Sequence, residues 1–168
     1  MSSLINFTPE DNSELKSPKN IVQEQCDELD RITNSLVIGK IQDYDGPIRS
    51  YSSNLASAIT RTMNPTFDVQ DELGDVSGTK FRFEFFLSSK HTPKFKYRVL
   101  FLEYGISFYP LLIVMDETIA KELNCQYCVE CNDETDFNNL LAGILNSDKM
   151  KNVVNSLFSI NIQEEKRF

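Results

Sequence analysis

A run of alternating aromatic and charged residues in the middle of the chain constrains its fold more than any other feature. Phe81, Phe83 and Phe85 alternate with Arg82 and Glu84. In an extended strand every second side chain points to the same face, so this pattern predicts a strand with one apolar face and one polar face.

Two further β-rich runs follow this strand after short links. The first is expected to place two alternating sets of residues on opposite faces, with Phe95, Tyr97, Val99 and Phe101 against Lys96, Arg98, Leu100 and Leu102. The second, residues 108–115, is apolar on both faces and is expected to lie centrally or to be covered on both sides. Runs of this kind joined by short links predict a three-stranded antiparallel meander over about residues 80–115.

Apolar residues at helical spacing predict helices on both sides of the meander. Ser17 and Pro18 suit the N-cap and first position of an opening helix, and a short strand is expected at 36–41. The other expected elements are a helix between Asp45 and Asn64, a short helix from Asp116, a short strand ending near Cys128, and helices at 137–145 and from Ser147. This order predicts an α+β fold, in which helices pack on one face of a mostly antiparallel sheet made of the meander and one or two short strands.

The length of 168 residues corresponds to one domain. We expect a mobile N-terminal tail at 1–16, a single α+β domain at 17–160 and a polar C-terminal tail at 161–168. The N-terminus lacks the basic and apolar segments of a secretory signal, and the longest apolar run, 109–115, is too short to cross a bilayer. The sequence therefore predicts a cytoplasmic protein with reduced thiols and no membrane association.

The balance of charged residues limits the classes of partner and of chemistry. There are 17 basic and 25 acidic residues, a net charge of -8, which argues against duplex DNA and anionic membranes as general partners. The single histidine, His91, lies in an expected turn without an orienting partner, and a chain with 6 glycines shows no phosphate-binding loop. We therefore predict no catalytic residue, no enzymatic activity and no cofactor.

Three cysteines at C-x2-C-x2-C spacing form the most metal-like feature of the sequence. Cys125, Cys128 and Cys131 would need a fourth ligand to complete a zinc or iron–sulfur site, either Cys26, His91 or a nearby carboxylate. In a strand, Cys128 would point away from the other two, and no glycine or proline shapes the segment as a metal-binding loop. We interpret these residues as ordinary half-buried thiols and predict no bound metal.

The expected hairpin between residues 88 and 98 carries four cations and no acid. Aromatic side chains are interleaved with these cations, a pattern that can bind single-stranded nucleic acid by stacking and phosphate contact. The same pattern is typical of a strand with aromatics inward and lysines outward, which discourages aggregation at a sheet edge. We favour the second interpretation and keep the first as an alternative ligand-binding site, formed by Lys90, Lys94, Phe95, Lys96 and Arg98.

Acidic residues gather in two segments. Residues 116–136 hold seven acids and one lysine, a net charge of -6, and residues 1–35 hold seven acids and three cations, a net charge of -4. Acidic surfaces attract basic proteins and accelerate their association, although solubility alone would also explain such segments. We predict a partner-binding surface made by Glu24, Asp27, Glu28, Asp30, Glu130, Asp133, Glu134 and Asp136.

In outline, this small acidic α+β chain resembles two kinds of helper protein. One is the immunity or antitoxin type, which blocks a basic nuclease toxin by charge complementarity, and the other is the secretion-chaperone type, which is often dimeric. The leading hypothesis is a non-enzymatic protein-binding module that engages a basic partner. Homodimerisation through an open sheet edge, and single-stranded nucleic-acid or phosphate binding through the 88–98 hairpin, are the alternatives.

Overall fold

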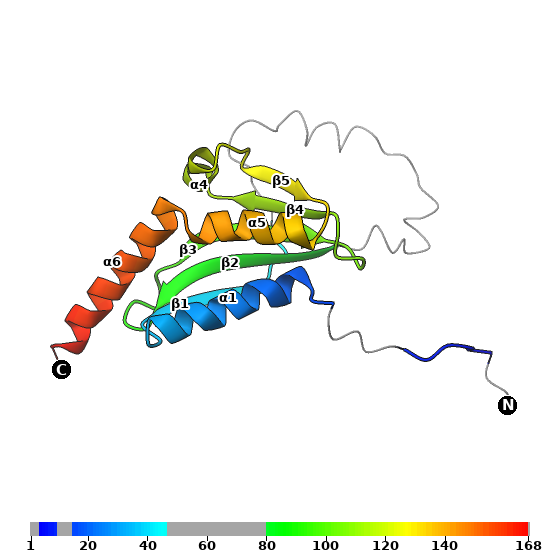
Figure 1. Ribbon diagram of the computed structural model, residues 1–168. Helices are drawn as coiled ribbons and strands as arrows, with labels where there is room; N and C mark the ends of the chain where they lie inside the picture. The colour runs from blue at the N-terminus through cyan, green and yellow to red at the C-terminus, as the bar shows by residue number, and fades with distance from the viewer. Residues whose placement is uncertain (1–3, 10–14, 47–79, 168) are drawn as a thin grey trace.

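The computed structural model describes residues 4–9, 15–46 and 80–167, which form an α+β fold (Figure 1). One five-stranded antiparallel sheet has the strand order β1-β2-β3-β4-β5. The strands are β1 Val37–Asp43, β2 Phe81–Ser89, β3 Tyr97–Tyr104, β4 Leu111–Met115 and β5 Cys128–Cys131. Each strand pairs with its neighbours in the sequence, so the predicted meander is confirmed and has one further strand on either side.

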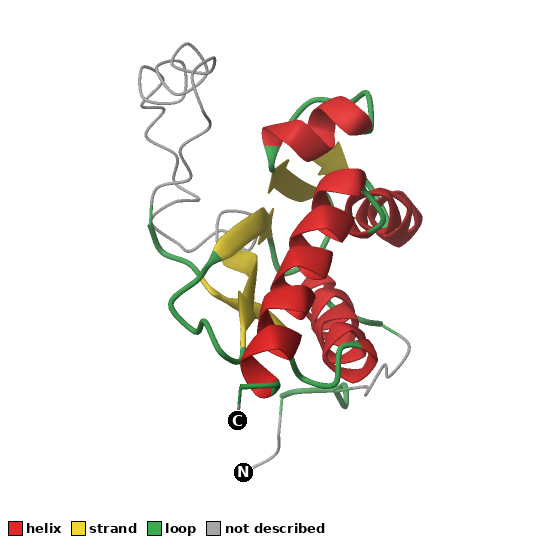
Figure 2. Ribbon diagram, turned by 90° about the vertical axis from the view of Figure 1, so that its left-hand side faces the viewer, coloured by secondary structure: helices red, strands yellow, loops and turns green. Residues whose placement is uncertain are grey.

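The helices of the described residues are α1 Pro18–Ile32, α4 Glu117–Glu122, α5 Glu134–Leu145 and α6 Asp148–Glu165. Figures 1 and 2 show α1, α5 and α6 on the same side of the sheet. Each helix begins at a residue whose side chain accepts a hydrogen bond from the first turn, and these N-caps are Ser17, Asp116, Asp133 and Ser147. Such caps satisfy backbone donors that lack an intrahelical partner, which explains why the helices begin at these positions.

The hydrophobic core lies between the helices and one face of the sheet, which we call the inner face. Phe85 is 1% exposed at the centre of this face, and Phe137 of α5 is 0% exposed. The same cluster includes Val22 and Cys26 of α1 and Leu157 of α6. Phe83 and Phe85 of the predicted first meander strand therefore belong to the core, as the alternating pattern indicates, whereas Phe81 at its start is 40% exposed.

A β-bulge at Val99 changes which residues of β3 reach the core. Phe85 lies opposite Leu100, whereas the next residue, Phe86, lies opposite Arg98, so Val99 is an extra residue in the ladder. An extra residue shifts the following side chains to the other face. Leu100 and the buried Leu102 consequently lie on the inner face, and the predicted alternation beyond Val99 is wrong. Phe101 lies instead on the opposite face, which we call the outer face.

Three element boundaries differ from those expected. β4 begins at Leu111 rather than at 108, because Pro110 has no N–H for the ladder. The strand expected to end near Cys128 instead begins there. α6 continues to Glu165 through the expected polar tail, because Asn161 is fully buried against the fold.

The predicted helix between Asp45 and Asn64 falls mainly in 47–79, which lies outside the described residues. At the N-terminus, Leu4, Ile5 and Phe7 are exposed. Within the described ranges, no helix combines the length and apolar character needed to cross a lipid bilayer.

Candidate functional site

The acids predicted on the first helix lie on the exposed side of α1. They have different local partners there. Glu24 forms an ion pair with Lys16, with 2.8 Å between Oε1 and Nζ. Glu28 forms an ion pair with Arg31, three residues further along the helix. Asp27 accepts a hydrogen bond from Gln23, and Asp30 accepts one from the Ser35 hydroxyl. Lys16, the partner of Glu24, precedes α1 and is also within electrostatic range of Glu134 at the start of α5.

Of the three acids predicted at the start of α5, two bind backbone N–H groups of the helix start and the third, Glu134, lines a groove. Asp133 accepts a hydrogen bond from the backbone N–H of Asp136, and Asp136 accepts one from the N–H of Asn132. Both therefore stabilise the start of the helix. Glu134 is exposed, and it takes part in a groove between α5 and α1.

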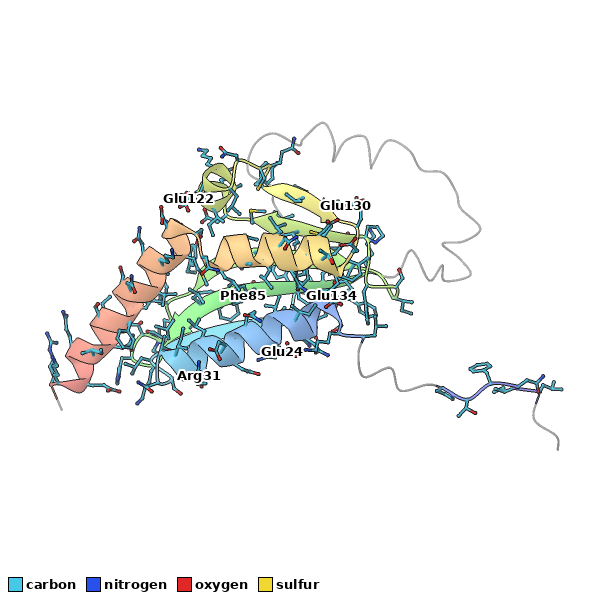
Figure 3. The ribbon with its side chains drawn as sticks, viewed as in Figure 1. Glu24, Arg31, Phe85, Glu122, Glu130 and Glu134 are labelled. Atoms are coloured by element: carbon cyan, nitrogen blue, oxygen red, sulfur yellow. The ribbon has the colours of Figure 1, made fainter. Side chains whose placement is uncertain are left out.

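This groove has a volume of about 330 Å³, and we call it the acidic groove. Its lining combines charged side chains, polar amides and apolar side chains: Lys16, Ile21, Glu24, Gln25, Glu134, Asn138, Leu141, Ala142 and Leu145. Glu24 and Glu134 come from the two helices that flank it (Figure 3). The structure thus brings together one acid from each of the two predicted segments.

A cation of the chain itself occupies the rim of the acidic groove. The hydrogen bond and charge of Glu24, with a smaller contribution from the charge of Glu134, raise the pKa of Lys16 above its usual value of 10.5. The ammonium group of Lys16 therefore lies against Glu24 and within electrostatic range of Glu134. Glu130 does not contribute, because it lies opposite Leu112 on the outer face of the sheet.

The cations of the predicted hairpin do not form one site. Lys90 lies 3.3 Å from Glu165 at the end of α6, whereas Lys96 and Arg98 both contact Glu84. Lys94 has no ion pair with any residue that the structure describes, and Phe95 is 42% exposed just before β3. The alternative ligand-binding set is therefore divided, and only Lys96 and Arg98 are held together.

Sequence reasoning missed the carboxylate that joins these two cations. The Glu84 side chain is 3% exposed and accepts hydrogen bonds from Lys96 Nζ at 2.6 Å, Arg98 Nε at 2.9 Å and Gln42 Nε2 at 2.7 Å. Burial raises the pKa of Glu84, but the hydrogen bonds from Lys96 and Gln42 and the charges of both cations outweigh it, so the pKa is lowered. The signal was a glutamate flanked by Phe83, Phe85 and Phe86, which needs charged partners when it is buried.

Aromatic rings of the outer face support the same cations. Lys96 Nζ lies 4.3 Å from the ring centroid of Phe86, and the Arg98 guanidinium lies 5.1 Å from that of Phe101 and 5.4 Å from that of Tyr44. Cation–π contacts of this kind hold a cation over a ring. We call Gln42, Glu84, Lys96 and Arg98, with these three rings, the Glu84 cluster.

The three cysteines of the C-x2-C-x2-C segment do not converge on one point in the part of the chain that the structure describes. No group of three His, Cys, Asp or Glu residues there could hold a metal ion. Cys131 is buried on the inner face, whereas Cys128 lies at an outer-face position and Cys125 precedes the strand. Cys125 and Cys128 line a pocket of about 390 Å³ between α4 and β5. The backbone N–H of His91 donates to Asn161, and its Nε2 lies 3.6 Å from Glu165.

Comparison with known proteins adds no functional information. No family model matches the sequence, and neither the curated proteins nor the solved structures gave a match.

Proposed function

We propose that this chain is a non-enzymatic protein-binding module whose acidic groove receives a basic segment of a partner protein. The observation that carries the proposal is the position of Lys16, whose ammonium lies 2.8 Å from Glu24 at the rim of a groove shared with Glu134. A cytoplasmic inhibitor of the immunity or antitoxin type would use such a surface.

The chemistry of the groove defines the segment that it would bind. Ile21, Leu141 and Leu145 contribute apolar side chains to the lining that Glu24 and Glu134 share. A partner segment with lysine or arginine next to aliphatic side chains would match both features, because the cation replaces Lys16 while the aliphatic groups cover the lining. The exposed acids around α1 would add long-range attraction, which raises the association rate at low salt.

Charge reversal tests this proposal. A basic partner is first isolated by pull-down from the source organism and identified by mass spectrometry, and its affinity for the purified chain is then measured. The double variant Glu24→Lys with Glu134→Lys should bind at least about tenfold more weakly, because two attractive contacts become repulsive. Glu130→Lys is the control for each single reversal, Glu24→Lys and Glu134→Lys, since it changes the net charge equally at an exposed acid on the outer face.

Equal affinities for the double variant and the wild type, unchanged by salt, would refute the proposal. A second pair of variants, Glu24→Gln and Glu134→Gln, removes the charge with little change in shape. Thermal unfolding of each variant establishes that any loss of binding is not a loss of fold. Light scattering of the same samples tests the homodimer alternative, in which binding partners would be copies of this chain.

A further inference from the structure

We propose that Lys96 and Arg98 form a phosphate-binding site on the outer face of the sheet. This site is separate from the acidic groove, which lies between helices on the inner side. The proposal does not depend on the protein-binding function.

The Glu84 cluster holds both cations in place while leaving them accessible. The Glu84 side chain is 3% exposed, whereas those of Lys96 and Arg98 are 37% and 44% exposed. An anion approaching from solvent therefore meets the two cations before the carboxylate beneath them. Contacts with the three aromatic rings restrict the same two side chains, so less conformational freedom is lost when a ligand binds.

The donors that remain suit a tetrahedral oxyanion. Arg98 gives its Nε to Glu84, and in the described part of the chain its two Nη groups donate to no other residue. Lys96 likewise gives one donor of its ammonium to Glu84. A guanidinium edge binds two oxygens of a phosphate at once, and an ammonium beside it adds a point charge to a third.

The charges of the cluster leave one unit of positive charge for the ligand. Two cations face one carboxylate, and Glu84 already accepts three hydrogen bonds, from Lys96, Arg98 and Gln42. The neighbouring Arg82 is engaged by Glu103 at 3.3 Å, so it does not complete the set. A phosphate monoester or diester would neutralise the surplus, whether it belongs to a small ligand or to a single-stranded nucleic acid.

The test follows the side-chain Nε–Hε signal of Arg98 by NMR in the full chain. The probes are inorganic phosphate, a nucleoside monophosphate and a single-stranded oligonucleotide, each compared with sodium chloride at equal ionic strength. A saturable shift with phosphate beyond that of chloride supports the site. If affinity rises with the length of the oligonucleotide, the ligand of the site is a nucleic-acid backbone. If the oligonucleotide binds no more tightly per phosphate than the nucleoside monophosphate, the ligand is a small phosphate compound.

Variants distinguish phosphate binding at this site from nonspecific attraction of an anion to the cations of the hairpin. Arg98→Lys keeps the charge and can still reach Glu84, but it loses the two Nη groups and should bind at least about tenfold more weakly. Lys94→Ala removes a cation of the same hairpin outside the cluster and should leave the affinity within about twofold. If Arg98→Lys fails to fold, Lys96→Met tests the second cation, because its side chain still covers Phe86. A shift no larger than that with chloride, or equal losses in Arg98→Lys and Lys94→Ala, would overturn the proposal.

Discussion

The backbone N–H of His91 donates a hydrogen bond of 2.8 Å to Oδ1 of Asn161, joining the turn between β2 and β3 to α6. Asn161 is 0% exposed, and its Nδ2 donates to the carbonyl of Leu157 at 2.6 Å. One amide side chain thus satisfies a backbone donor of the turn and a carbonyl of the helix. This link explains why α6 does not end at residue 160 and why a polar residue lies in the core.

We predict that Asn161→Ala lowers the free energy of unfolding by about 1–3 kcal/mol, because it removes a fully buried amide and leaves the partly buried N–H of His91 without its partner. Urea denaturation at neutral pH measures the change. Asn155→Ala is the control, since Asn155 is exposed on the same helix and its replacement should change stability by less than about 0.5 kcal/mol. Equal effects of the two substitutions would show that the bond to His91 adds nothing.

Local pattern predicted the α+β class, the three strands of the meander and the helix starts at Ser17, Asp116 and Ser147, because strand alternation and capping depend on neighbouring residues. Two features depended on distant residues and were therefore missed. The bulge at Val99 depends on the pairing of β3 with β2, and it moves Phe101 to the outer face. The helical conformation of 161–165 depends on the contact of Asn161 with a turn some 70 residues earlier.

A second prediction concerns the pH dependence that Glu84 gives to stability. Its pKa is lowered from the usual 4.5, so its contribution is present above that value and is lost as pH falls through the lower pKa of the folded state. Glu84→Gln should therefore be less stable than the wild type at pH 7, by about 1–3 kcal/mol, because Lys96 and Arg98 lose their carboxylate. The difference should shrink as pH falls below about 5.

Urea denaturation of both proteins at pH 7, 5 and 4 measures this difference. Glu130→Gln serves as the control, because it removes one exposed carboxylate and changes the net charge equally. A difference between Glu84→Gln and the wild type that stays constant with pH would contradict the role assigned to the buried charge.

Sequence identified the acids of the candidate site but not which of them act together. Asp133 and Asp136 serve as helix caps, and Glu28 is paired with Arg31. What brings Glu24 and Glu134 to one groove is the packing of α1 beside α5 on the inner face, which no local pattern encodes.

A third prediction follows from the position of Lys16 at the rim of the acidic groove. Lys16→Ala should strengthen the binding of a basic partner, because the partner's cation no longer has to displace Lys16 from the carboxylate of Glu24. The expected change is a twofold to tenfold lower Kd, about the effect of one exposed charge pair. Lys151→Ala is the matched control, since it removes an exposed cation from α6. Equal gains in the two variants would mean that only net charge matters, and a loss in Lys16→Ala would mean that Lys16 itself contacts the partner.

The last prediction concerns the reactivity of the buried thiols. Cys26 and Cys131 are each 2% exposed, and desolvation by burial raises the pKa of Cys26 to about 12 and that of Cys131 to about 11. The thiolate is the reactive form of cysteine. At pH 8, on the order of one folded molecule in a thousand or fewer has Cys26 or Cys131 deprotonated, whereas about a quarter of the thiols are deprotonated in the unfolded chain. Alkylation with iodoacetamide at pH 8, followed by peptide mass spectrometry, should label the half-buried Cys125 and Cys128 first. Cys26 and Cys131 should be labelled at least a hundredfold faster in urea than in the native protein. Native labelling of Cys131 at the rate seen in urea would show that β5 separates readily from β4, and would place the weakest part of the sheet at that edge.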